Sequence, residues 1–117
     1  MPGKTLNIAL IGTKFMGKAH SNAFRQVDKF FDLKKKPVLK VLCGRDAEGT
    51  KDAAEQMGWE EWSTDWKKVV HRDDIDVVDV SSPGHLHHPM VIEAAKAGKH
   101  IICEKPLANT SKEAADM

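Results

Sequence analysis

The 117-residue sequence predicts an α/β fold, a doubly wound parallel sheet with strand order 3-2-1-4-5. Short apolar or β-branched segments alternate with segments whose apolar residues recur every three or four positions, the pattern of strands alternating with helices. Such alternation implies parallel strands joined by right-handed crossovers. In this order ligands bind beyond the carboxyl ends of the strands, at the switch point between strands 1 and 4.

The first half of the chain supplies three predicted strands, over residues 6–11, 38–43 and, more weakly, 59–63. A helix over 46–57 is expected to end at Gly58 and to bury Ala53, Ala54 and Met57. Between the first two strands, the period changes to that of a helix from Met16 onward. Its expected inward face is formed by Met16, Ala19, Ala23, Val27 and Phe30, widened by His20, Phe24 and Phe31.

The second half supplies the fourth and fifth strands, over residues 75–80 and 100–103. Ser63 or Thr64 is expected to cap a short helix that contains Trp66, Val69 and Val70. Pro89 can open the next helix, which stops at Gly98. The final segment, Thr110-x-x-Glu113, has the form of a capping box at the start of a further helix.

The composition is that of an ordinary globular domain, with 41% hydrophobic residues, 30% charged residues and a formal charge of +1. This balance argues against nucleic acid or a membrane surface as a partner. No apolar run approaches the roughly 20 residues of a membrane span, so we expect one cytoplasmic domain. Cys43 and Cys103 should end strands roughly 14 Å apart, too far for a disulfide, and are interpreted as free thiols.

The first strand is followed by an incomplete dinucleotide fingerprint. In the pattern G-x-G-x-x-G, Gly12 and Gly17 fill the first and last places, and Lys14 occupies the middle one. The following helix N-terminus offers free N–H groups and a positive dipole end to a pyrophosphate. A lysine in the middle place crowds the phosphate, but its stem can swing away and its ammonium can pair with the same phosphate.

The end of the second strand reads Cys43-Gly44-Arg45-Asp46. An NAD site usually carries an acidic residue there to bind the ribose diol, and Gly44 stands where that residue is expected. Arg45 could face a 2′-phosphate or stack on adenine, so the sequence leaves both NAD and NADP open. The alternative is that Arg45 is a plain surface residue.

Two further motifs follow the fourth and fifth strands. Residues 81–88 contain three histidines within four positions, but no nearby cysteine or carboxylate completes a metal ligand set, so no metal is expected. Glu104-Lys105-Pro106 places a lysine at the mouth of the predicted crevice, where it could polarise a substrate oxygen or move a proton. Taken without its neighbours, Lys105 would be a surface residue.

Together these motifs resemble the Gfo/Idh/MocA oxidoreductase family over almost the entire chain. The resemblance rests on residues 12–20, on Ser82-Pro83-Gly84-x-x-His87, and on Ala97-Gly98-Lys99-His100 running into residues 104–108. The block from Gly98 to Pro106 is more specific than the glycine turn. Within the family, residues 15–22 and the Gly44-Arg45 pair are most similar to levoglucosan- and inositol-type sugar dehydrogenases, which gives a slight lean to NAD.

The resemblance implies a Rossmann-type domain that binds a nicotinamide coenzyme for oxidation or reduction of a sugar or cyclitol. It implies that Lys105 is catalytic, that the Lys105-Pro106 bond is often cis, and that Ser82, Pro83 and His87 line the nicotinamide side. The expected coenzyme-binding residues are Gly12, Thr13, Lys14, Phe15, Met16, Gly17, Gly44, Arg45, Ser82, Pro83, His87, Glu104 and Lys105.

Members of this family also carry a second α/β domain, which contributes the substrate pocket and the oligomer interface. We therefore expect residues 1–117 to be the coenzyme domain of a longer, homo-oligomeric enzyme, inactive without its second domain. Two alternatives stay open: a non-catalytic dinucleotide-binding or sensor module, and a structural domain in which Lys14 has abolished the site.

Overall fold

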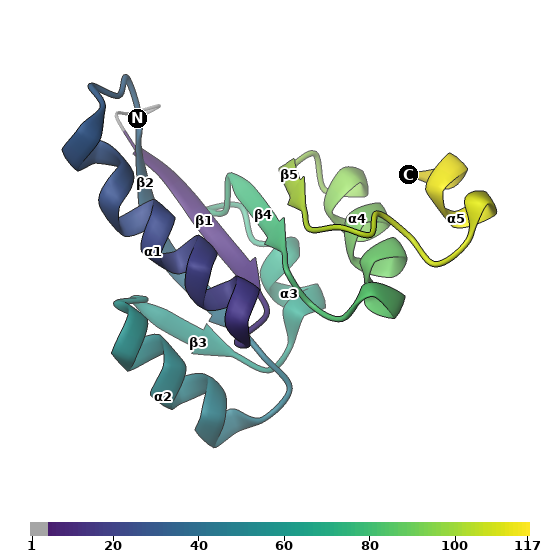
Figure 1. Ribbon diagram of the computed structural model, residues 1–117, viewed down its shortest axis with the longest axis horizontal. Helices are drawn as coiled ribbons and strands as arrows, with labels where there is room; N and C mark the ends of the chain where they lie inside the picture. Colours follow the sequence, from purple (N-terminus) through teal and green to yellow (C-terminus); the bar gives the residue numbers. More distant parts are fainter. Residues whose placement is uncertain (1–4) are drawn as a thin grey trace.

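The computed structural model describes residues 5–117 and contains one parallel five-stranded sheet. The strand order is β3-β2-β1-β4-β5, which confirms the predicted order (Figure 1). The strands are β1 (Thr5–Ile11), β2 (Lys36–Cys43), β3 (Glu61–Ser63), β4 (Val77–Val80) and β5 (His100–Cys103). The helices are α1 (Phe15–Phe30), α2 (Ala47–Met57), α3 (Trp66–Val70), α4 (His87–Lys96) and α5 (Ser111–Asp116), with a 3-10 turn, Gly84–Leu86, before α4.

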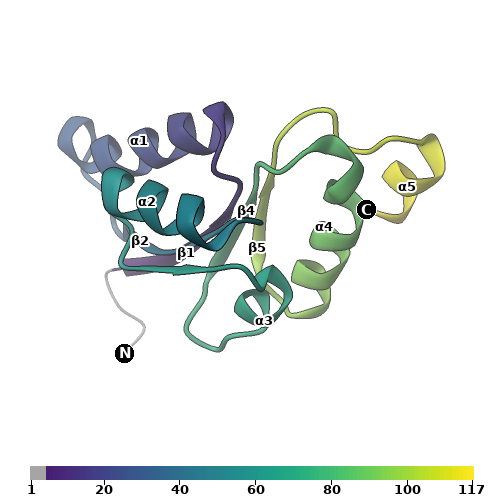
Figure 2. The ribbon, with the colours of Figure 1, turned by 90° about the horizontal axis from the view of Figure 1, so that it is seen from below.

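Helices α1 and α2 cover one face of the sheet and α3 and α4 cover the other (Figures 1 and 2). Successive residues of β1 point to opposite faces, so Ile8 and Leu10 join one core and Ala9 and Ile11 the other. All four side chains are at most 4% exposed. This two-sided burial explains why residues 8–11 of β1 form a continuous apolar run rather than an alternating one.

The predicted inward face of α1 is wrong at Met16, Ala19, Ala23 and Phe30, which are all exposed, and Phe31 beyond the helix is exposed as well. The cause is the close contact between the start of the helix and the turn before it. A Cβ at Gly17 would overlap the carbonyl oxygen of Gly12, so this position must face the turn. The residues that then face the sheet are Gly17, His20, Ser21, Phe24 and Val27.

Ser21 shows how a polar residue fits that inward face. Its hydroxyl donates to the Gly17 carbonyl at 2.7 Å and accepts from the indole Nε1 of Trp59 at 3.0 Å. Both bonds are buried, so no polar atom of the pair is left without a partner. Trp59, only 6% exposed, therefore joins α1 to the segment between α2 and β3.

The starts of α3, α4 and β4 also differ from the prediction. Asp65, rather than Ser63 or Thr64, caps α3 by accepting the Lys68 N–H at 3.1 Å. Helix α4 begins two residues before Pro89, which is tolerated because the first four N–H groups of a helix have no acceptor within it. β4 begins at residue 77 rather than 75, although Ile75 is buried.

The other predicted helix ends are confirmed. Gly58 and Gly98 have φ values of 85° and 73°, the left-handed conformation that ends α2 and α4. Thr110 Oγ1 accepts the Glu113 N–H at 3.1 Å, as expected of a capping box.

Cys43 and Cys103 are free, as predicted. In residues 5–117, no helix combines the length and apolar character needed to cross a bilayer.

Candidate functional site

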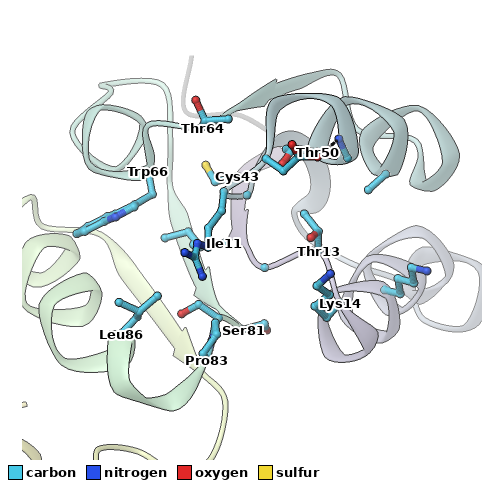
Figure 3. Close-up of a pocket in the computed structure, with 18 of the residues that line it drawn as sticks. Ile11, Thr13, Lys14, Cys43, Thr50, Thr64, Trp66, Ser81, Pro83 and Leu86 are labelled. Atoms are coloured by element: carbon cyan, nitrogen blue, oxygen red, sulfur yellow. Dashed lines mark hydrogen bonds between the residues drawn. The ribbon is translucent and has the colours of Figure 1, made fainter.

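The loops after β1, β2, β3 and β4 surround an open cavity of about 1010 Å³. Figure 3 shows Thr13 and Lys14 on one side of it, facing Trp66 and Leu86 on the other. The predicted site residues that line the cavity are Gly12, Thr13, Lys14, Phe15, Gly44, Arg45, Ser82 and Pro83. The cavity therefore lies at the carboxyl ends of the strands, where the predicted switch point placed it.

The turn after β1 is as tight as its glycines suggest. Gly12 has a φ of +135°, and a Cβ there would lie 2.6 Å from the Ser81 carbonyl oxygen. Its N–H donates to the Cys43 carbonyl at 3.0 Å, which joins the turn to the end of β2. Gly17 does not line the cavity but packs under Gly12, where a side chain has no room. The first and last glycines are thus required by backbone packing.

Lys14, in the middle place of the fingerprint, has an extended backbone with φ −86° and ψ −157°. A glycine is not needed for this conformation. Lys14 is the N-cap of α1, and its side chain makes no capping bond. The first helical bond runs from Lys18 N–H to Lys14 O, so the N–H groups of Phe15, Met16 and Gly17 have no acceptor within the helix. These donors and the Lys14 ammonium together favour an anion.

The turn after β2 has no space for the expected acidic residue. A Cβ at Gly44 would overlap the hydroxyl of Thr50 and would lie 2.8 Å from Cγ2 of Thr13. The next acidic residue, Asp46, lines the cavity and also caps α2, accepting the Gly49 N–H at 2.6 Å. Because one carboxylate oxygen holds the helix, the other is the acceptor available to a ligand.

His87 is placed differently from the other predicted site residues. It is 1% exposed and, in the described chain, does not line the cavity. Its Nε2 lies 2.8 Å from the Ser82 carbonyl oxygen and its Nδ1 lies 2.8 Å from that of Pro106. His87 therefore connects the loop after β4 to the loop after β5, which contains the cis Lys105-Pro106 bond.

Met16, Glu104 and Lys105 also lie outside the cavity lining among the described residues. Lys105 is exposed at the carboxyl end of β5. Glu104 is half-buried, and one of its carboxylate oxygens accepts the Lys105 main-chain N–H at 3.1 Å. The structure thus brings the first two motifs and Ser82-Pro83 to one cavity and leaves the Glu104-Lys105 pair beside it.

Glu104 is connected to the core through an ionisable network. His20 Nε2 lies 3.1 Å from Glu104 Oε2, and His20 Nδ1 lies 2.7 Å from Oδ2 of the fully buried Asp79. Burial lowers the pKa of His20, but the hydrogen bonds and charges of the two carboxylates outweigh it and leave that pKa raised. Burial raises the pKa of Asp79, which His20 partly offsets. The Lys105 N–H, and then His20, lower the pKa of Glu104.

Several residues that line the cavity were not among the predicted coenzyme-binding residues, although some belong to the motif over residues 81–88. Thr64 and Trp66 line the cavity just after β3, and Ser81, His85 and Leu86 line it after β4. Their signal in the sequence was position alone, since they directly follow strand ends. Asp79 was also missed, although an acidic residue inside the apolar run Val77–Val80 is unusual for a buried strand.

The thiols and histidines give no sign of other chemistry. Burial raises the pKa of the Cys43 thiol to about 12, and burial together with Asp79 and Glu104 raises that of Cys103. Neither environment favours a reactive thiolate. Within residues 5–117, no three His, Cys, Asp or Glu side chains are grouped so that they could hold a metal ion.

A glycine turn, an uncapped helix N-terminus and a cavity at the switch point of a parallel sheet define a dinucleotide-binding domain. Residues 6–117 match the model of the GFO_IDH_MocA family, described as an oxidoreductase family with an NAD-binding Rossmann fold. The chain belongs to this family. The predicted family, fold and nicotinamide coenzyme are therefore confirmed.

Relatives of known structure or activity are much longer than this chain. Levoglucosan dehydrogenase of Pseudarthrobacter phenanthrenivorans is 46% identical over 115 residues, which are 97% of this chain and 30% of the relative. A structure of levoglucosan dehydrogenase with NADH and L-sorbose has a TM-score of 0.94, 46% identity, and coverage of 96% of this chain and 30% of that one. An oxidoreductase domain protein from Kribbella flavida has a TM-score of 0.94 and 53% identity, over 97% of this chain and 30% of its own.

Proposed function

We propose that residues 1–117 are the coenzyme-binding domain of a longer, homo-oligomeric NAD-dependent sugar or cyclitol dehydrogenase. The observation that carries the proposal is the uncapped N-terminus of α1, which opens onto the cavity beneath the Gly12 turn. The 46% identity to levoglucosan dehydrogenase, solved with NADH and a sugar, supports both the coenzyme and the substrate class. The substrate pocket and the oligomer interface belong to the second domain that we propose.

The residues around the cavity fit a dinucleotide. The free N–H groups at the start of α1 and the Lys14 ammonium receive the pyrophosphate, which can approach closely because Gly12 has no side chain. Asp46 and Arg45 face the ribose and the adenine at the end of β2. Ser82 and Pro83 border the nicotinamide side. Bound nicotinamide supplies the hydride acceptor or donor.

Lys105 is the residue that we assign to proton chemistry. It leaves β5 next to the nicotinamide side, on a loop that Glu104 and His87 hold. During alcohol oxidation the carbinol carbon gives up a hydride and its hydroxyl loses a proton. The Lys105 ammonium donates a hydrogen bond to that oxygen and stabilises the developing negative charge. It takes up the hydroxyl proton as one of its own protons leaves toward a histidine that we place in the second domain.

One observation favours a second candidate function. Among the residues that the structure describes, Lys105 does not line the cavity. A non-catalytic dinucleotide-binding or sensor module has no need of a lysine there. Such a module would use the same coenzyme site without turnover.

Coenzyme binding and turnover test the two candidates separately. Titration of the 117-residue chain with NAD, NADH, NADP and NADPH by calorimetry should show binding with a preference for NAD and NADH. Assays of the full-length protein with NAD and levoglucosan or myo-inositol should show turnover. Binding without turnover on either sugar or other cyclitols would favour the sensor module, and no binding to the full-length protein would contradict both.

A further inference from the structure

His20 joins three parts of the chain that are far apart in sequence. It lies on α1, three residues after Gly17, and faces Asp79 of β4 and Glu104 after β5. Asp79 is fully buried, and the Ser81 hydroxyl donates to its second oxygen at 3.1 Å. Asp79 thus sits on a rigid central strand and fixes the orientation of the imidazole ring, as a buried carboxylate does for a paired histidine.

The far side of the ring reaches the Lys105 loop. His20 Nε2 lies 3.1 Å from Glu104 Oε2, while Glu104 Oε1 accepts the Lys105 main-chain N–H at 3.1 Å. One carboxylate is therefore held by His20 and itself holds Lys105. Ionised carboxylates only accept hydrogen bonds, so His20 satisfies both neighbours only when both ring nitrogens carry a proton.

We propose that His20, seated on Asp79, is a positioning residue that fixes Glu104 and through it the main chain of Lys105. The inference rests on the proposed catalytic role of Lys105, and it extends that role to a residue of the first motif. His20 does not contact the cavity in the described chain and is not assigned a catalytic part.

The charges around His20 indicate why its protonation matters. The groups that face it are Asp79 and the Ser81 hydroxyl from β4 and its end, and Glu104 from the end of β5. The Lys105 ammonium, at the next position after Glu104, also lowers the pKa of that carboxyl. The two carboxylates in turn raise the pKa of the Cys103 thiol at the end of β5, after burial, which is the larger cause. The two carboxylates raise the pKa of His20 and so favour the imidazolium, which can donate a hydrogen bond to each of them. After loss of that proton His20 can donate to only one of the two carboxylates. We place the remaining proton on Nδ1, toward the closer Asp79 at 2.7 Å, so the hydrogen bond from His20 to Glu104 is lost.

Proton-dependent positioning can be measured without any turnover. In the 117-residue chain, the amide proton of Lys105 should show one NMR titration step with a midpoint above pH 6.5, the ordinary pKa of histidine. His20→Gln should remove this step, and Asp79→Asn should move its midpoint down. A Lys105 amide that does not titrate, or that titrates equally in His20→Gln, would overturn the proposal.

Kinetics of the full-length enzyme, with NAD and levoglucosan as the probe sugar, give the second test. His20→Gln should lower kcat by about tenfold to a hundredfold, the cost of a misplaced catalytic group. The KM for NAD should change by less than about threefold, because the cavity lining is untouched. Added imidazole should restore part of the activity of His20→Ala, since the His20 side chain is 21% exposed and its site can be entered.

A matched control is available in His71, whose Nε2 lies 2.8 Å from Glu93 Oε1 at the far end of α4. His71→Gln removes a similar histidine–glutamate pair and should leave kcat unchanged. If Lys105→Ala keeps a normal kcat, the proposed function fails while the NMR step stands. If Lys105→Ala is impaired but His20→Gln is normal, the positioning role is wrong and the proposed function stands.

Discussion

The main chain of Gly12 lies directly against that of Ser81, because a Cβ at Gly12 would come within 2.6 Å of the Ser81 carbonyl oxygen. The turns after β1 and β4 therefore fit together without any side chain between them. Gly12 and Ser81 both line the cavity, so this contact lies at the switch point between β1 and β4. The fingerprint glycine is thus required by the main chain that follows the neighbouring strand, independently of any ligand.

Side chains at the two glycines should be costly. We expect Gly12→Ala and Gly17→Ala each to lower the free energy of unfolding by about 1–3 kcal/mol, because the Cβ meets main-chain carbonyls that cannot move independently. Urea denaturation measures the change. Gly84→Ala is the control: its Cβ would lie 3.6 Å from the nearest atoms, so we expect a change within about 0.5 kcal/mol. Equal stability of all three variants would contradict this account of the turn.

Lys14 should modify the coenzyme site without being essential to it. Its backbone is extended, so glycine brings no conformational gain, and a contact between partly exposed charges is worth about 1 kcal/mol or less. We expect Lys14→Gly to change NADH affinity by no more than about tenfold in the full-length enzyme. Fluorescence titration measures it. A hundredfold loss would make the lysine an essential ligand, and a similar gain would make it an obstruction.

Lys99 should act as a structural residue rather than as part of the site. Its ammonium donates to the carbonyl oxygens of Arg72 at 2.6 Å and Ile75 at 2.7 Å, which ties the start of β5 to the segment before β4. We expect Lys99→Met to cost about 1.5–3 kcal/mol, the range for hydrogen bonds to a charged group. Thermal and urea unfolding should both show it. Lys96→Met, at an exposed position of α4, should stay within about 0.5 kcal/mol.

The spacing of the apolar residues predicts which segments are strands and which are helices. Because strands and helices alternate, the doubly wound sheet order could be predicted as well. The cavity followed from that order, since the strand ends fix where Gly12, Gly44 and Ser82 meet. The inward face of α1 could not be predicted in the same way. Periodicity alone allowed several rotations of this helix, and the overlap of a Gly17 Cβ with Gly12, which chooses one, is a tertiary contact.

The network around His20 illustrates the same limit. The sequence pattern places His20 on the inward face of a helix and Asp79 within a strand. Their 2.7 Å contact spans 59 positions and depends on the rotation of α1 and on which face of β4 turns toward it. The local sequence pattern predicts helices and strands. A polar contact between distant residues can be predicted only when the relative position and rotation of both elements are known.

The raised pKa of His20 predicts a pH dependence of stability. A group whose pKa is higher in the folded than in the unfolded chain stabilises the fold fully below its unfolded value, here near 6.5, and loses that contribution as the pH rises through the folded value. We therefore expect the free energy of unfolding to fall as the pH rises above 6.5. Urea denaturation at a series of pH values measures it. His20→Gln should make the free energy of unfolding nearly independent of pH above 6.5. His71→Gln should leave the decrease in that range unchanged.

Lys105 should contribute to chemistry and little to coenzyme binding. It is exposed at the end of β5, and the carbonyl of Pro106 and the carboxylate of Glu104 hold the loop on either side of it. Its removal should therefore leave the loop in place while the reacting oxygen loses its hydrogen bond. We expect Lys105→Ala in the full-length enzyme to lower kcat by about 10²–10⁴-fold, the usual contribution of a positioned acid–base group.

The dissociation constant of NADH for the same variant should stay within about threefold of wild type, because the cavity lining is unchanged. Stopped-flow measurement of hydride transfer, with deuterated sugar to identify the chemical step, separates slow chemistry from slow product release. Lys112→Ala, which removes an exposed lysine of α5, is the control and should behave as wild type.

The 117-residue chain should bind NADH but turn over no sugar, since we place the substrate pocket in the second domain. Near-normal hydride transfer in Lys105→Ala, or turnover by the 117-residue chain, would contradict the assignment of Lys105.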